Sequence, residues 1–208
     1  ALRLAGIDRS TPDPPGGIAV RDARGNPTGI LKGAARELVE RVIPPPSEEQ
    51  IVTALEEAQA YANARGVTSV RDISCTPGVP RAYRTMFRTG RLTVRVTCAL
   101  LGSGSTPPFG SDWDNGSMNV MKGIYEAVTR RTPAPGRKIT VEEAVRAYCA
   151  GRSIEPGKLA DFVVLSNDIF SIDPSKIPGT EVLATIFNGV PVYGYLSPLR
   201  DKSGLILR

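Results

Sequence analysis

Residues 47–73 constrain the fold of this chain more than any other stretch. The sequence SEEQ at positions 47–50 is a capping box, in which a serine hydroxyl and a glutamine side chain satisfy amide groups of the first helical turn. Apolar residues then recur at helical spacing: Ile51, Leu55, Ala58 and Ala62. Gly66 suits the left-handed C′ position, and the β-branched segment 67–73 follows at once. Helix, glycine and strand in this order predict half of a βαβ unit, and therefore a parallel sheet with helices outside it.

The alternation of helices and strands continues beyond this unit. Residues 81–88 predict a helix, and residues 92–101 predict a second strand. Further helices are predicted at residues 117–131 and, behind a second capping box that begins at Thr140, at residues 141–148. This order of elements is typical of an α/β fold.

The N-terminal stretch interrupts that alternation. Residues 11–31 carry prolines and paired glycines around two short apolar segments, which predicts a small excursion hairpin outside the core. A short helix at residues 32–41 is expected to close it, because three consecutive prolines follow soon afterwards.

The apolar period changes to two after Gly151, which indicates a small β module. Strands are predicted at three places: residues 161–165, 182–187 and 190–195. The last two flank Asn188-Gly189, a strong hairpin signal. We therefore expect a domain boundary near Gly151, with the α/β part at residues 1–150 and the β module at residues 151–208.

Composition excludes several classes of protein. The chain has 208 residues, 41% hydrophobic and 23% charged, which is ordinary for a globular protein. No apolar run reaches the roughly 18–20 residues that a membrane-spanning helix needs, so we expect no membrane contact. The net charge of +5 is scattered, whereas nucleic-acid binding needs a concentrated basic patch, so we expect no nucleic-acid partner. The first residues lack a signal peptide and an initiator Met, and we expect a fragment or a processed product.

The three cysteines carry no recognisable metal or redox motif. Cys75, Cys98 and Cys149 are far apart in the sequence and form no C-x-x-C pair. We interpret them as buried structural thiols in a reducing compartment, which favours a cytoplasmic location. A metal site built from these cysteines is the alternative, although their spacing does not favour tetrahedral ligation.

Three side chains are candidates for a functional site. Asp112 follows a short apolar lead-in and precedes a predicted helix, the position of a carboxylate presented at the end of a barrel strand. Such a carboxylate can accept a proton or bind a metal, while an N-cap or loop role is the alternative. Trp113 is expected to line a substrate pocket or to belong to the core. Asp72 ends a predicted strand and faces the pocket or caps a helix. Ser111 is a poor nucleophile candidate, because it lacks the G-x-S-x-G elbow and no histidine can act as its base.

Several stretches, taken in order, resemble the YtcJ-like branch of the metal-dependent amidohydrolase superfamily, the amidohydrolase 3 type. The resemblance covers most of residues 1–195. It is carried by ALRLAGI, TPDPPGGIAVRDARGNPTGILK, PPPSEEQ with GVTSVRD, FGSDW with GIYEAVTRRTP, ITVEEAVRAY, SIEPGKLADFVVLSNDIFSIDP and VLATIFNGVPVY. These motifs are specific for the family and leave the substrate open.

The resemblance implies a fold and a chemistry. The expected fold is α/β, a partial (β/α)8 TIM barrel of amidohydrolase type with a small C-terminal β-sandwich module. The expected cofactor is a divalent metal, usually zinc, held at the C-terminal ends of barrel strands by histidines. Such a metal makes a bound water nucleophilic, and the family's aspartate, which Asp112 matches, moves the proton. The expected substrate is a small molecule with a C–N bond other than a peptide bond.

The chain departs from the family pattern because it contains no histidine, so its residues support no metal ligand set of the family type. We expect the histidine-bearing segments to fall before residue 1, between residues 101 and 109, and at residues 150–151. A family barrel exceeds about 200 residues by itself, so this chain cannot close eight strands. Either segments of a longer protein are absent from the sequence, or the protein is a truncated relic. The sequence thus predicts a hydrolase that is inactive if the chain is complete. The alternative is a non-catalytic interaction or structural module that self-associates as a homo-oligomer.

Overall fold

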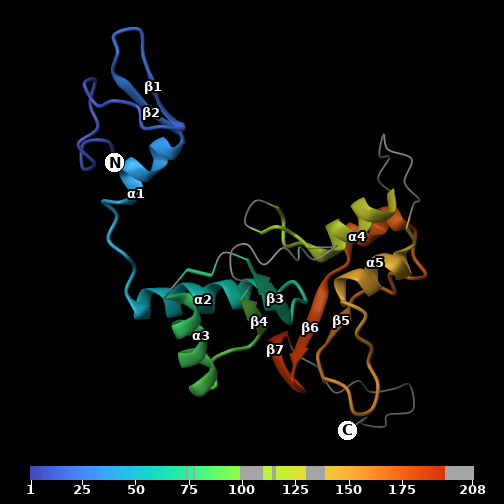
Figure 1. Cartoon of the computed structure of the whole chain (residues 1–208). Helices are drawn as coiled ribbons and strands as arrows, with labels where there is room; N and C mark the ends of the chain where they lie inside the picture. The colour runs from blue at the N-terminus through green and yellow to red at the C-terminus, as the bar shows by residue number, and fades with distance from the viewer. Residues whose placement is uncertain (74, 77, 99–109, 114–115, 130–138, 195–208) are drawn as a thin grey trace. The chain divides into compact units, whose positions relative to one another are not determined.

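The computed structural model describes residues 1–73, 75–76, 78–98, 110–113, 116–129 and 139–194 (Figure 1). The chain divides into two compact units, Ala1–Ser47 and Glu48–Arg208. Each unit has its own β structure.

An antiparallel hairpin organises the first unit. Its strands are β1, Gly17–Arg21, and β2, Pro27–Gly33, so the predicted hairpin forms, while its role as an excursion from the α/β part stays a prediction. Asp22 fixes the turn between them, because its carboxylate accepts hydrogen bonds from the backbone amides of Arg24 and Asn26. The helix predicted at residues 32–41 is shorter and divided into a 3-10 turn and one α turn: η1, Ala34–Arg36, and α1, Glu37–Glu40.

The second unit begins with the predicted alternation of helices and strands. Its first four elements are α2, Glu48–Asn63; β3, Ser69–Asp72; α3, Val79–Arg88; and β4, Arg95–Cys98. β3 and β4 pair in parallel, as predicted. Gly66 has φ +76°, which confirms the left-handed residue that ends α2 and turns the chain into β3. The serine cap of α2 stays a prediction.

Two small clusters of buried side chains join these elements. One packs α3 against α2, and the other packs α2 and the parallel strands against Met118. Their buried members are Val52, Ala82 and Met86 in the first and Ala62, Val94 and Met118 in the second. Burying one such Met or Val side chain contributes about 1.5–3 kcal/mol, so these clusters hold the parallel strands in register against α2.

The next helices build the largest buried cluster. They are α4, Val120–Thr129; α5, Val141–Tyr148; and the 3-10 helix η2, Pro174–Gly179. The capping box at Thr140 is confirmed, because the Glu143 amide donates to the Thr140 hydroxyl and the Thr140 amide donates to the Glu143 carboxylate. The cluster consists of Met121, Ile124, Ala144, Ile169 and Ile177.

The C-terminal strands form a three-stranded antiparallel sheet in the order β5-β6-β7. The strands are β5, Phe162–Leu165; β6, Val182–Phe187; and β7, Val190–Gly194. Asn188 and Gly189 connect β6 to β7 with φ of +55° and +81°, the left-handed pair of a type I′ turn. The predicted hairpin is therefore confirmed.

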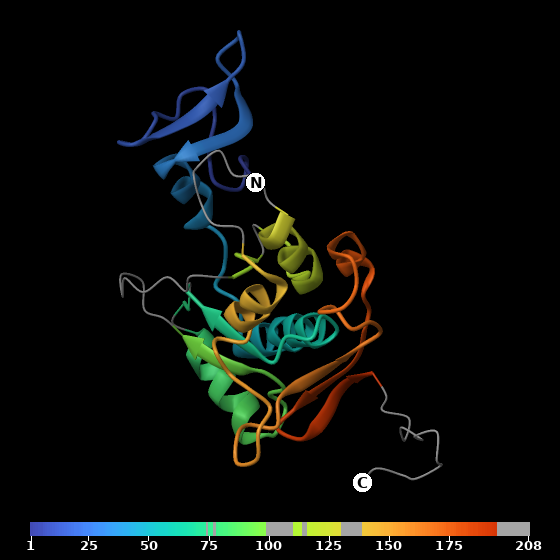
Figure 2. The same ribbon diagram turned by 90° about the vertical axis from the view of Figure 1, so that its right-hand side faces the viewer.

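The ribbon of this sheet lies close to the parallel strands and α2 (Figure 2), and polar contacts connect it to β4 and to α2. Asp161, just before β5, forms a bidentate ion pair with Arg95 on β4, at 2.9 and 3.0 Å. The Thr185 hydroxyl on β6 donates to the backbone carbonyl of Asn63 at the end of α2, at 2.6 Å. Because the Asp161 side chain is only 7% exposed and Thr185 is buried, these bonds hold the C-terminal sheet firmly against β4 and α2.

The described residues contain mixed helices and strands in open sheets, and no closed barrel is present among them. The α/β character and the parallel pairing are as predicted. The partial (β/α)8 barrel, the sandwich character of the C-terminal strands and the boundary near Gly151 stay predictions.

Candidate functional site

Asp112 lies in an exposed segment that has no regular secondary structure. Gly110, Ser111 and Asp112 form no strand, and the apolar lead-in at residue 109 lies outside the described residues. Asp112 has φ +47°, and its carbonyl accepts a hydrogen bond from the amide of Gly116 at 2.8 Å. The strand expected to lead into this carboxylate falls on residues outside the described part of the chain, so the strand-end position of Asp112 stays a prediction.

Trp113 is not a core residue, contrary to one of its two sequence interpretations. Its side chain is 46% exposed and stacks on Tyr61 of α2, with ring centroids 5.6 Å apart. The guanidinium of Arg65 lies 3.3 Å from the centroid of the same tyrosine ring. The tryptophan therefore belongs to a surface cluster on α2.

Asp72 is the predicted site residue that the fold places at a strand end. It is the last residue of β3 and lies opposite Cys98, the last residue of β4, in the parallel register. The carboxyl ends of parallel strands are where α/β proteins present their functional side chains. The N-cap residue of α3 is Gly78, which makes no side-chain cap hydrogen bond, and the helix-capping role of Asp72 stays a prediction.

The cysteines correct the sequence analysis. Cys75 and Cys98 form a disulfide across 23 residues, so they are not free thiols, and Cys149 is exposed rather than buried. The parallel pairing of β3 and β4 makes the disulfide possible, because it brings the end of β4 beside the loop after β3. The Cα atoms of Cys75 and Cys98 are 5.8 Å apart. The argument from thiols to a reducing compartment therefore no longer holds, and the cytoplasmic location stays a prediction.

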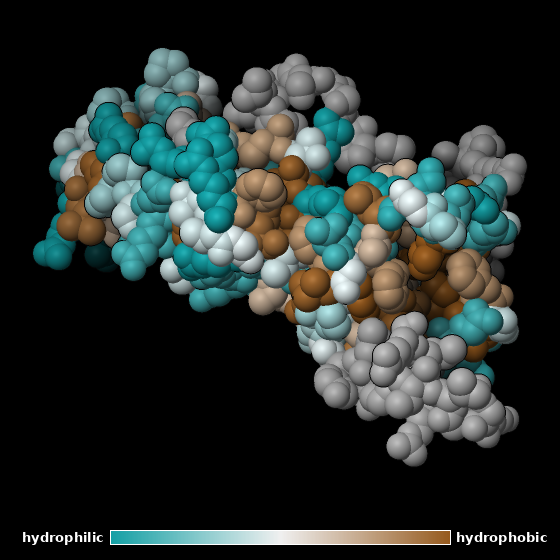
Figure 3. Space-filling model, turned by 90° about the horizontal axis from the view of Figure 1, so that it is seen from below, coloured by the Kyte–Doolittle hydropathy of each residue, from teal (hydrophilic) through white to brown (hydrophobic). Residues whose placement is uncertain are grey.

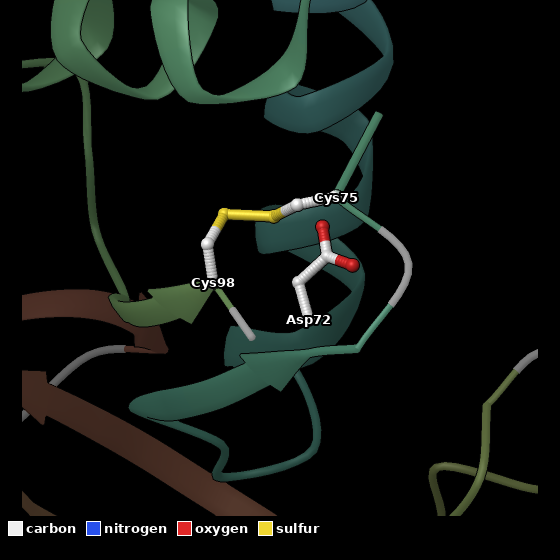
Figure 4. A group of neighbouring side chains, drawn as sticks. All are labelled: Asp72, Cys75 and Cys98. Atoms are coloured by element: carbon white, nitrogen blue, oxygen red, sulfur yellow. A yellow bond between two sulfur atoms is a disulfide. The ribbon is translucent and has the colours of Figure 1, made fainter. Parts of the chain in front are cut away.

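Asp72 and the disulfide form one compact group (Figure 4). One ligand atom from each of Asp72, Cys75 and Cys98 lies within 4.8 Å of the others. The figure shows the Asp72 carboxylate rising from β3 towards the two sulfur atoms. Neither Asp112 nor Cys149 belongs to this group. The sequence analysis missed it because Cys98 meets Asp72 only through strand register.

Tyr83 of α3 faces the Asp72 carboxylate. Burial raises the pKa of Tyr83 to about 12, and the negative charge of Asp72 and a hydrogen bond to it act in the same direction. A neutral phenol is a hydrogen-bond donor, so Tyr83 holds the carboxylate in one orientation. No sequence signal links these two residues, because the contact depends on how α3 packs.

The residues present do not fit a histidine-held metal of the expected kind. The chain contains no histidine, and in the described part the group of three candidate ligands is Asp72, Cys75 and Cys98. Two of these three ligand atoms are bonded to each other in the disulfide and are not thiolates. The metal of the family therefore has no ligand set in this part of the chain.

Comparison with known proteins identifies the family. The model of the amidohydrolase family, Amidohydro_3, matches residues 1–107 and residues 97–193. The chain is 44% identical over 68 residues to a Bacillus subtilis (strain 168) protein named putative amidohydrolase YtcJ, over 33% of this chain and 13% of that protein. It is also 44% identical over 73 residues to the Arabidopsis thaliana protein LONG AFTER FAR-RED 3, over 35% of this chain and 12% of that protein. No solved structure matches the chain.

These matches show that the chain belongs to the amidohydrolase family, in its amidohydrolase 3 or YtcJ-like branch. The aligned stretches span about an eighth of the length of the two curated relatives. Among the described residues, no helix combines the length and apolar character needed to cross a bilayer.

Proposed function

We propose that the chain derives from a hydrolase of C–N bonds other than peptide bonds, acting on a small molecule. Membership of the amidohydrolase family carries this proposal. The matched stretches run from the first residue to residue 193, so the likeness extends along both the α/β part and the C-terminal strands. From the same family membership we infer that the parallel strands β3 and β4 derive from a barrel.

Within that activity we assign proton transfer to Asp112, because it is the residue that matches the family's aspartate. Its carboxylate belongs to an exposed residue. General acid–base transfer by such a group contributes about 10²–10⁴-fold to a rate. Trp113, beside it, and Asp72, at the end of β3, are the proposed substrate contacts.

The 208 residues by themselves are expected not to turn over such a substrate. They contain no histidine, and the carboxylate of Asp112 lies outside the group that Asp72 forms with the two cysteines. Without an activated water beside it, the Asp112 carboxylate has no molecule to deprotonate, so no nucleophile forms. The family model also matches as two overlapping stretches rather than one, which supports the shortening between residues 101 and 109.

A second function, a non-catalytic interaction or structural module, is favoured by the exposed surface. In the described part of the chain the parallel sheet has two strands, so each presents an edge without a strand partner there. Large apolar side chains are exposed on the second unit, and hydrophobic patches are visible on the face shown in Figure 3. The most exposed are Phe87, Ile154, Phe170 and Val190. Unpaired edges and apolar patches predict self-association.

One experiment separates the two functions. The native protein is purified from its own cells, its intact mass is compared with 22.2 kDa, and release of ammonia or amine is measured on a panel of cyclic and linear amides with Zn²⁺ added. A longer protein that hydrolyses a member of the panel, and whose Asp112→Asn variant loses about 10²–10⁴-fold in kcat, supports the hydrolase.

The opposite results favour the module. A native mass of 22.2 kDa without hydrolysis, together with oligomers in light scattering, supports the second function. A 208-residue chain that binds one equivalent of zinc, lost in Asp112→Asn, contradicts the proposed inactivity. A well-behaved monomer contradicts the self-associating module.

A further inference from the structure

Asp72, Cys75 and Cys98 are held together by the fold and not by sequence proximity. The parallel register pairs Asp72 with Cys98, and Cys75 lies in the loop that follows β3. Burial of Val94 just before β4, against Ala62 of α2, fixes that register. Reduction of the disulfide therefore leaves the Cys98 thiol beside the carboxylate, because the paired strands β3 and β4 are held by other contacts. The Cys75 thiol stays in the loop three residues after Asp72.

The three side chains are suitable ligands for a thiophilic divalent cation. Zinc binds thiolates and carboxylates in a tetrahedron with Zn–S of about 2.3 Å, which sets two thiolates about 3.8 Å apart. The three ligand atoms here all lie within 4.8 Å of one another, so small side-chain rotations reach that arrangement. Two thiolates and one carboxylate fill three of the four tetrahedral positions and leave the fourth to water. Their three negative charges exceed the two positive charges of the cation by one.

Tyr83 supplies the outer contact that such ligands usually have. Carboxylates that bind metals are commonly hydrogen-bonded to a second side chain, which fixes their orientation. The Tyr83 phenol on α3 makes such a bond to Asp72. The carboxylate is therefore preorganised before any ligand arrives.

We propose that Asp72, Cys75 and Cys98 form a redox-gated binding site for a thiophilic divalent cation, open when the two cysteines are reduced and closed by their disulfide. The proposal goes beyond the hydrolase function and does not depend on it, since it uses neither Asp112 nor a substrate. It also differs from the histidine-held metal of the family in its ligands.

The site opens when a dithiol or a phosphine reduces the disulfide between Cys75 and Cys98. A dithiol gives two electrons and two protons to the disulfide and becomes a cyclic disulfide itself, and the S–S bond is replaced by two S–H bonds. A phosphine reaches the same two thiols with one water and leaves as its oxide. The cation then displaces two protons as it binds the thiolates, so affinity rises with pH.

The test uses the whole chain and Co²⁺ as a spectroscopic substitute for Zn²⁺. The protein is reduced with a phosphine, freed of it under argon and titrated with Co²⁺. The expected result is one equivalent bound, with thiolate-to-cobalt charge-transfer and tetrahedral visible bands that Zn²⁺ displaces. Unreduced protein is expected to give no such bands.

The variants identify the ligands. Cys75→Ser and Cys98→Ser are expected to abolish the charge-transfer band or weaken Co²⁺ binding at least about 100-fold, and Asp72→Asn at least about tenfold. Cys149→Ser is the matched control, because it removes an exposed thiol outside the group and is expected to leave the titration unchanged. Circular dichroism of each reduced variant checks that it folds.

A measurement on the unaltered chain complements the variants. In reduced protein, Zn²⁺ is expected to protect Cys75 and Cys98 from iodoacetamide at least about tenfold, by peptide mass spectrometry, and to leave Cys149 reactive. The site is refuted if reduced protein binds no Co²⁺ that Zn²⁺ can displace. It is also refuted if the Cys75→Ser/Cys98→Ser double variant binds Co²⁺ as tightly as the wild type. If the unreduced protein, once denatured, contains three thiols that react with a thiol reagent, then the disulfide is absent and the redox gating is refuted.

Discussion

The ion pair between Asp161 and Arg95 is the contact whose loss tests the arrangement of the second unit best. The Asp161 side chain is only 7% exposed, and it accepts two hydrogen bonds from Arg95 and a third from the backbone amide of Asn188 at 2.8 Å. Asp161→Asn keeps the shape of the side chain but removes the charge and turns an amide donor towards the guanidinium.

The expected cost follows from these contacts. Removing one partner of a buried ion pair costs about 3–5 kcal/mol when the other is left without solvent. Arg95 is 31% exposed and recovers part of its hydration, and its guanidinium also lies 4.9 Å from the centroid of the Phe187 ring. We therefore expect Asp161→Asn to lower the free energy of unfolding by about 2–3 kcal/mol, in line with hydrogen bonds to charged groups.

Urea unfolding, followed by far-ultraviolet circular dichroism, measures this cost. With a slope of about 2 kcal/mol/M the midpoint is expected to fall by about 1–1.5 M. Glu142→Gln is the matched control, because it breaks an exposed ion pair with Arg146. The side chain of Glu142 is 65% exposed and that of Arg146 is 71% exposed, so the substitution is expected to lower the free energy of unfolding by only about 0.3–0.5 kcal/mol.

Equal losses in the two variants, within about 0.5 kcal/mol, would refute the argument that burial gives the Asp161 pair its strength. A double variant gives an independent check. Arg95→Met is expected to be less harmful in the Asp161→Asn background than in the wild type, because the partner charge is already gone. Additive effects of the two substitutions would contradict the pairing.

Two further predictions concern the packing around α2 and α3. Gly66→Ala is expected to cost about 1–3 kcal/mol more in urea unfolding than Gly90→Ala, because both glycines have positive φ but only the Cβ at 66 would lie 2.9 Å from Val163. Equal costs would contradict the packing of the turn after α2 against β5. Tyr83→Phe is expected to remove one late step, at about pH 12, from an ultraviolet titration of tyrosine ionisation. Since folding raises this pKa, the contribution of Tyr83 to stability is complete below about pH 10 and is lost between pH 10 and 12. A step lost near pH 10 instead would show that the phenol is not buried beside Asp72.

The elements predicted well are those with a signal inside a few consecutive residues. Gly66 ends α2, and Asn188-Gly189 joins β6 and β7, because left-handed backbone favours glycine and asparagine wherever they occur. Thr140 caps α5 through a residue only three positions away. Such signals depend little on what packs against the segment.

The candidate site was predicted in part. Asp72 was chosen as a strand-end carboxylate, and the fold places it at the end of β3. The disulfide was missed, because a sequence separation of 23 says nothing about distance until the register of β3 and β4 is known. Asp112 is exposed and has no regular secondary structure, and the strand expected before it falls on residues outside the described part of the chain, so its strand-end position stays a prediction.

The sequence by itself determined the helices, the hairpins and the family, because capping boxes, glycine turns, apolar periods and motifs are properties of neighbouring residues. Only the tertiary structure decided that Asp72 meets Cys98 and Cys75, and that Asp161 meets Arg95. Those meetings depend on strand register and on helix packing. Both are set by many weak buried contacts along the second unit, and no short stretch of the chain contains enough of them to reveal the outcome.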